Sequence, residues 1–129
     1  MFKYQEKENK KLGYKYKNYF LTQGDSFSLS ATEVNGNVDE PLIGKVLFKL
    51  GLNEAECKIN PVFEQEYVKM EDGVWLLKVG SKSTTDWKPT CANEDEPYVY
   101  EIEVYFIDGE PETIASGEFT VLPQIGGAL

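Results

Sequence analysis

Acidic side chains are the most numerous groups in this sequence that could do chemistry, with 22 Asp and Glu among 129 residues. Hard cations take several oxygen ligands, so residues 94–96 and the group Asp108, Glu110 and Glu112 are candidates for calcium. Neither matches the spacing and the fixed glycine of a calcium-binding loop, and clusters arise by chance in so acidic a chain. The same abundance weakens any carboxylate pair proposed as a glycosidase acid and base. We therefore expect solvated loops there, with no metal and no cofactor.

Histidine and arginine are both absent from the chain. Without histidine the protein lacks the commonest general base, the usual zinc ligand and the base of Ser-His and Cys-His pairs. Without arginine it lacks the preferred bidentate clamp for phosphate and carboxylate groups. Cys57 and Cys91 match no metal-binding or redox spacing, so we expect reduced thiols, and a disulfide only if the two lie close in space. The sequence predicts that this protein is not an enzyme.

Tryptophan supplies the first candidate binding group. Trp87 stands beside Lys88 and Pro89, where its ring could form an exposed platform for a sugar. We favour the other position, in which Trp87 packs inward and closes one end of the fold, as a lone aromatic residue after a helical turn commonly does. Trp75 falls within a predicted strand, and we expect it in the core.

The second candidate interaction site alternates aromatic and basic side chains, namely Tyr14, Lys15, Tyr16 and Lys17. Residues 1–17 hold six lysines and two glutamates, a charge of +4, which leaves −13 for the rest of a chain whose total is −9. Alternating aromatic and basic side chains occur in proteins that bind single-stranded nucleic acid. The acidic remainder of the chain, however, repels nucleic acids and anionic membranes. We expect this basic segment to contact the acidic surface of a neighbouring copy or another subunit. A tail without a role is the alternative.

The elements that must position these groups are strands, and the clearest pair is a hairpin over residues 97–123. Every second residue from Tyr98 is apolar, while Glu101 and Glu103 face the other way. A polar turn then leads to a return strand with one shared face, made of Thr113, Ala115, Gly117, Phe119 and Val121. Two strands alone are not stable in water, so the apolar face of this hairpin needs a second layer.

Further strands are predicted at short intervals, over residues 14–21, 26–31, 45–50 and 74–79. The last of these has apolar residues on both faces, so we expect it to be covered on both sides. Residues 51–72 keep no single period and include Pro61, so we expect one or two short strands there. Ser83 and Asp86 predict one helical turn, which Pro89 stops.

This pattern predicts an antiparallel β-sandwich of about seven strands with one short helical turn, and a small barrel is the alternative. We expect a mobile basic arm at residues 1–13, the sandwich domain at 14–123 and a tail at 124–129. No apolar run approaches the roughly 20 residues of a membrane-spanning helix. The N-terminus also lacks the apolar region of a secretory signal, so we expect folding in a cytoplasm.

Several segments, taken in order, resemble the N-terminal domain family of the upper baseplate protein of phages that infect Gram-positive bacteria. They are Thr22–Asp25 before an alternating strand, Tyr98–Ile102, the Asp108-Gly109 turn, and the set Thr113, Gly117, Phe119 and Val121. Together they span about residues 19–123. The resemblance implies an immunoglobulin-like sandwich in a phage or prophage tail or baseplate, made in the bacterial cytoplasm and located in the virion.

The resemblance also implies a structural role without catalysis, through contacts with other tail or baseplate subunits. A homo-oligomer fits such a role, whereas we expect no nucleic acid and no membrane as partners. The alternative function is a carbohydrate-binding β-sandwich that uses Trp87 and exposed tyrosines as stacking surfaces.

Overall fold

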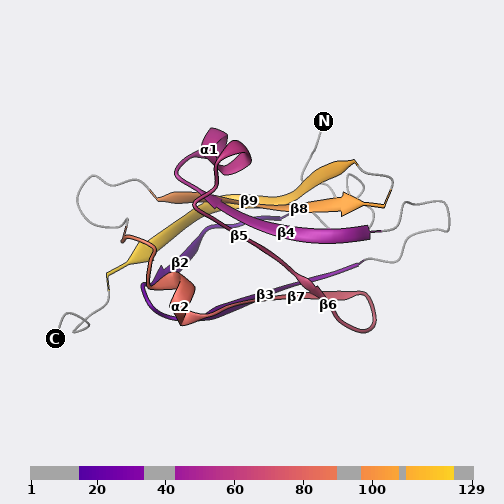
Figure 1. The fold of residues 1–129 in the computed structure, drawn as a ribbon, viewed down its shortest axis with the longest axis horizontal. Helices are drawn as coiled ribbons and strands as arrows, with labels where there is room; N and C mark the ends of the chain where they lie inside the picture. The colour runs from indigo at the N-terminus through magenta and orange to yellow at the C-terminus, as the bar shows by residue number, and fades with distance from the viewer. Residues whose placement is uncertain (1–14, 34–42, 90–96, 108–109, 124–129) are drawn as a thin grey trace.

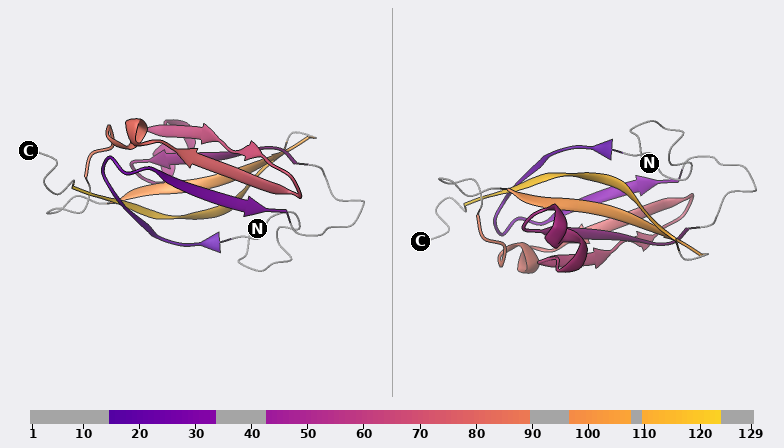
Figure 2. Two further views of the ribbon diagram at one scale, coloured as in Figure 1. Left: turned by 90° about the horizontal axis from the view of Figure 1, so that it is seen from below. Right: turned by 90° about the horizontal axis from the view of Figure 1, so that it is seen from above.

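Two β-sheets face each other and enclose the core of this protein (Figures 1 and 2). The computed structural model describes residues 15–33, 43–89, 97–107 and 110–123. The described strands are β1 (Lys15–Tyr16), β2 (Tyr19–Thr22), β3 (Phe27–Thr32), β4 (Ile43–Gly51), β5 (Phe63–Glu66), β6 (Val68–Lys69), β7 (Val74–Val79), β8 (Tyr98–Phe106) and β9 (Pro111–Leu122). The described helices are α1 (Glu54–Ile59) and α2 (Ser81–Thr84), and neither is long and apolar enough to cross a membrane.

The larger sheet has the strand order β1-β9-β8-β4-β5, with β2 also paired to β9, and the smaller sheet has the order β3-β7-β6. This division of strands is that of an immunoglobulin-like sandwich, which confirms the predicted fold class. No pairing joins the two sheets within the described ranges, so the barrel alternative is wrong. One feature departs from the antiparallel prediction, because β1 and β2 run parallel to β9.

The predicted hairpin is present as β8 and β9 (Figure 1). Its apolar face is buried as expected. The return strand differs from the prediction at one point. Ile102 pairs with Ala115 but Glu103 pairs with Thr113, so Ile114 is an extra residue in the ladder. Thr113 therefore lies on the outer face with Glu103 and not with Ala115. An inserted residue shifts the alternation by one, and the composition of the strand does not reveal it.

Aromatic rings from both sheets fill the core between the layers. Phe48 of β4 stacks on Tyr100 of β8 with ring centroids 5.9 Å apart. Phe119 of β9 meets Phe27 of the opposite sheet at 5.5 Å. Each fully buried apolar side chain contributes about 1.5–3 kcal/mol relative to its exposed state, so this cluster accounts for much of the stability of the sandwich.

The first predicted strand, residues 14–21, is divided into β1 and β2. Asn18 lies between them and its side-chain oxygen accepts the Glu118 N–H at 2.9 Å. The neighbouring Lys17 carbonyl accepts the Tyr100 hydroxyl at 2.6 Å. Gly117 allows this close approach, because a Cβ there would overlap the Lys17 carbonyl. Tyr14 and the expected arm and tail lie outside the described residues.

Helix α1 is an element that the sequence pattern did not predict. It begins after Asn53, whose side-chain oxygen accepts the Glu56 N–H at 2.8 Å as an N-cap. The helix lies on the outer face of the larger sheet, over β4 and β8 (Figure 1). Gly51 permits this contact, because a Cβ there would come within 2.5 Å of the Cys57 backbone nitrogen. The two short strands expected in the same region are present as β5 and β6.

Strand β7 is buried on one face and only partly covered on the other, whereas we expected both faces to be covered. Trp75, Leu77 and Val79 are buried, while on the other face Val74 and Leu76 are half-buried and Lys78 is exposed. The predicted helical turn is confirmed as α2, although it starts at Ser81 with Gly80 as its N-cap.

Candidate functional site

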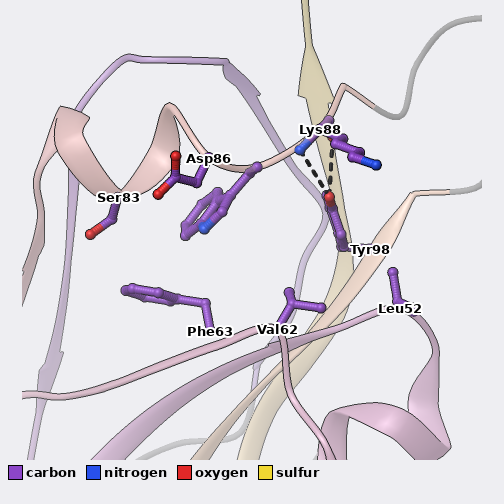
Figure 3. Close-up of a pocket in the computed structure, with 8 residues that line it drawn as sticks. Leu52, Val62, Phe63, Ser83, Asp86, Lys88 and Tyr98 are labelled. Carbon is purple, nitrogen blue, oxygen red and sulfur yellow. Dashed lines mark hydrogen bonds between the residues drawn. The ribbon is translucent and has the colours of Figure 1, made fainter.

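A cavity of about 420 Å³ lies at one end of the sandwich, between the α2 segment and the chain around β5 (Figure 3). Its lining is mostly apolar, with exposed Leu52 and Val62 at the rim. Three polar residues follow on or after α2. The full lining comprises Leu52, Val62, Phe63, Ser83, Asp86, Trp87, Lys88 and Tyr98. A mostly apolar cavity with a few polar groups is typical of a binding site.

Hydrogen bonds from the β2–β3 turn and from β8 fix the α2 segment that forms one wall of the cavity. The Gln23 side chain donates to the Thr85 carbonyl at 2.9 Å and to the Trp87 carbonyl at 3.0 Å. The Thr84 hydroxyl donates to the Asp25 carbonyl at 2.8 Å. The Tyr98 hydroxyl accepts the Lys88 N–H and donates to the Lys88 carbonyl (Figure 3). The wall is therefore pinned to the β2–β3 turn and to the start of β8.

Trp87 is buried in this wall and only 5% of its surface is exposed. Its ring packs against Phe63 at 5.0 Å, Phe119 at 5.7 Å and Phe27 at 6.0 Å. Of the two positions considered for Trp87, the exposed sugar platform is wrong, because these rings cover the indole. Trp87 closes one end of the core, as the favoured position predicted. Its isolation after a helical turn was the signal for this position.

The two indole groups of the chain lie in different surroundings. The ring of Trp87 lines the cavity. The indole N–H of Trp75 donates to the Glu33 carboxylate at 2.8 Å.

The polar side chains of the cavity lining can make hydrogen bonds and charge contacts. Ser83 carries an aliphatic hydroxyl group. Asp86 can accept hydrogen bonds and Lys88 can donate them. The cavity therefore suits a bound group with an apolar body, a hydrogen-bond acceptor and a positive or negative charge at the edge of that group.

The basic and aromatic segment predicted as an interaction site lies away from this cavity. Lys15 and Tyr16 form β1, opposite Ala115 and Ser116 on β9. Tyr16 is 62% exposed, and the Lys17 ammonium lies 5.3 Å from the centre of the Tyr19 ring. The structure thus places Tyr16 and Lys17 on the edge of the larger sheet, accessible to a partner.

A layer of buried charge under α1 was missed by the sequence pattern, which predicted only that Glu101 and Glu103 face away from the core. Glu101 is 3% exposed and accepts the Lys58 ammonium at 3.0 Å. Glu103 pairs with Lys49 at 3.1 Å. Burial lowers the pKa of Lys49, but its hydrogen bond and attraction to Glu103 raise it more, so the pKa is raised overall. Both carboxylates are thus engaged in ion pairs.

Two further buried groups titrate outside their usual range. Burial, and then the negative charge of Glu101, raise the pKa of the Cys57 thiol to about 12, which keeps this free thiol protonated and inert. Burial also raises the pKa of Tyr67, whose hydroxyl has no hydrogen-bond partner within the described part of the chain. Cys91, the other half of any disulfide, lies outside the described residues.

Only part of the acidic segments considered as calcium sites lies within the described residues. Glu110 is exposed and precedes β9, while residues 94–96 and Asp108 lie outside the described residues. Among the described residues no three His, Cys, Asp or Glu side chains are grouped to hold a metal ion.

Comparisons with known proteins find similarity at the level of structure. No protein-family model and no curated protein matches the chain. The chain is similar to the titin M3 domain, with 11% identity and a TM-score of 0.44 over 81% of this chain and 88% of that one. It is also similar to extracellular domains 3–5 of Drosophila OTK, with 9% identity and a TM-score of 0.39, over 83% of this chain and 32% of that one.

Proposed function

We propose that this chain is a non-enzymatic structural component of a phage or prophage tail or baseplate, which acts through protein–protein contacts. The observation that carries the proposal is the cavity beside Trp87, whose rim exposes 60% of Leu52 and 47% of Val62 on a rigid sandwich. Exposed apolar side chains around a buried aromatic residue are typical of a protein-binding surface.

The resemblance to the upper baseplate family also supports the proposal, because its residues have structural tasks here. Gly24 has a φ of 91° in the turn that follows β2, a conformation that favours glycine. Phe119 lies in the core, and Gly117 admits the Lys17 carbonyl. Such residues specify a scaffold, and a scaffold acts through the surfaces it presents. The partners we propose are other tail or baseplate subunits in the virion.

Mass spectrometry of purified particles tests this function. Particles from an induced lysogen should contain peptides of this chain in a constant ratio to tail proteins across the density gradient. A lysogen in which the gene is deleted serves as the control and should release particles with incomplete tails. Absence of the chain from intact particles would overturn the proposal.

A carbohydrate-binding module is the alternative function, and the buried position of Trp87 removes its expected stacking surface. A glycan array separates the two functions, and we expect no specific binding. Sugar binding that is lost on Asp86→Ala, an exposed residue of the cavity, would favour the alternative. This variant is preferable to Trp87→Ala, which would also remove core packing.

A further inference from the structure

Strand β3 is an open edge of the smaller sheet, on the same side of the sandwich as β2 (Figure 2). It pairs with β7 on one side, and no other described strand pairs with it. The Glu33 N–H that follows β3 donates to the Gly73 carbonyl, and in an antiparallel ladder every second residue bonds the same neighbour. The residues of β3 that direct their main-chain N–H and C=O groups to the open edge are therefore Ser28, Ser30 and Thr32.

Strand β3 lacks the features with which proteins protect an open edge. Protected edges carry charged side chains or proline, or are very short. Among the other described edge strands, β5 carries Glu64 and Glu66 at exposed positions, and β1, β2 and β6 have two to four residues. Strand β3 has six residues in regular alternation, and none of them is charged or proline. Such an edge is available for pairing with another strand.

The core is incompletely covered beside this edge. Phe27, Leu29 and Ala31 face the other sheet but are only half-buried, whereas the residues opposite them on β7 are buried. A cavity of about 140 Å³ lies between β2 and β3 and is lined mainly by apolar side chains of both, including Phe20, which is 70% exposed. A strand added to β3 would extend the smaller sheet over this cavity and cover these side chains.

The residue pattern of β3 matches a second copy of the same strand. In an antiparallel pair with a twofold axis at Ser30, this serine lies opposite its counterpart and Ser28 lies opposite Thr32. Serine and threonine side chains in such positions can hydrogen-bond across the strands. On the inner face Leu29 lies opposite Ala31, so both faces of the pair match. Charge favours the same contact, because copies that each carry −9 repel each other least where neither presents a charge.

We propose that this protein forms a twofold dimer in which the β3 strands of two copies pair antiparallel and join the smaller sheets into one continuous sheet. The contact uses the same surface of both copies, so it closes and stops at two. The cavity beside β3 shares no lining residue with the cavity beside Trp87, which is therefore not part of this contact. This inference goes beyond the proposed function, and the dimer can fail while the chain remains a virion component.

Two full-length variants with opposite charges at Ser30 test the proposal. Ser30→Lys and Ser30→Asp each place like charges directly opposite each other in the paired strands, which is destabilising. Either variant alone should raise the dissociation constant of the dimer at least about tenfold, as measured by sedimentation equilibrium. Val68→Lys and Val68→Asp, at an exposed position on the far edge strand of the same sheet, are the matched controls and should dimerise as the unmodified chain does.

Mixing the two Ser30 variants gives the decisive measurement. The lysine of one copy then lies opposite the aspartate of the other, so an equimolar mixture should form one-to-one dimers. Equal thermal stability of the variants shows that they are folded. An unmodified chain that stays monomeric up to about 0.1 mM overturns the proposal, and so does association that persists in both variants. Loss of association in both variants without recovery in the mixture also overturns it, because β3 would then pair with a different segment.

Amide hydrogen exchange of the unmodified chain provides a second measurement that needs no variant. The open-edge amides of Ser28, Ser30 and Thr32 should exchange more slowly as the protein concentration rises, because dimerisation protects them. The amides of Leu29 and Ala31 bond β7 and should be protected at every concentration. Slow exchange at Ser30 at every concentration would assign the edge to a segment of the same chain, and fast exchange at every concentration would leave the edge unpaired. Either result overturns the proposal.

Discussion

At Gly117 the backbone of β9 passes against the carbonyl group of Lys17, and an added Cβ would lie 2.8 Å from the Lys17 carbonyl carbon. Gly117→Ser should therefore push β1 and β2 away from β9 and lower the free energy of unfolding by about 1–3 kcal/mol. Thermal unfolding followed by circular dichroism should show a Tm lower by several degrees.

The matched control for this substitution is Gly80→Ser. Gly80 has nothing within 4 Å of a built Cβ and precedes α2, where serine is a favourable N-cap. Its Tm should stay within a degree or two of the unmodified chain. Equal effects of the two serines would show that the approach of Lys17 to β9 is not tight.

The Cys57 thiol should make stability fall in alkaline solution. Its pKa is raised from 9.0 to about 12 in the folded chain, so the folded state keeps a proton that the unfolded state releases. This contribution is complete below about pH 9 and is lost as the pH rises toward 12. Cys57→Ala should lower the urea midpoint at neutral pH through its cavity, yet reduce the further decrease between about pH 8 and pH 11. An equal decrease of the urea midpoint with pH in Cys57→Ala and in the unmodified chain would contradict this assignment.

At the scale of the element, α1 depends on its cap more than on its length. Six residues form at most two turns, and such short helices are marginal in water without capping and packing. Asn53→Ala removes the acceptor for the Glu56 N–H and should lower the free energy of unfolding by about 1 kcal/mol. Asn53→Asp keeps an acceptor and should be nearly neutral, and urea denaturation of the pair measures the difference.

Elements with one buried face could be predicted from the sequence, because alternation records burial directly. The hairpin, β3 and most of β4 follow from this pattern, and the turn at Gly24 follows from glycine geometry. Helix α1 was missed because Asn53 and Glu56, which resemble a capping box, precede no apolar periodicity. The helix is held by its contact with the sheet, and a local pattern does not contain that contact.

The candidate site was predicted only in part. Trp87 could be named from its residue type, and its two possible positions followed from its place after a helical turn. The choice between them depends on Phe27, Phe63 and Phe119, which come from three separate strands. The parallel pairing of β2 with β9 also escaped prediction, because alternation gives the face of a strand but not its neighbour.

At the scale of the whole molecule, the separation of charge between residues 1–17 and the remainder should control association. Lys15 and Tyr16 belong to β1, and the Lys17 carbonyl binds Tyr100, so a deletion should stop at residue 13. Removing residues 1–13 should weaken self-association or partner binding at about 0.1 M salt. The difference in association between the full chain and the shortened chain should shrink at about 1 M salt, where charges are screened beyond about 3 Å. Light scattering measures the association of each, and a difference that does not depend on salt would exclude an electrostatic cause.

The parallel ladder of β2 and β9 also gives this protein a mechanical property. A pull between residues 15 and 122 would draw two side-by-side strands in opposite directions along their length, so their hydrogen bonds would share the load in shear. A pull between residues 98 and 122 would start near one end of the β8–β9 ladder and open it bond by bond. Single-molecule extension should show a higher rupture force in the first geometry, which suits a part that transmits tension between its neighbours.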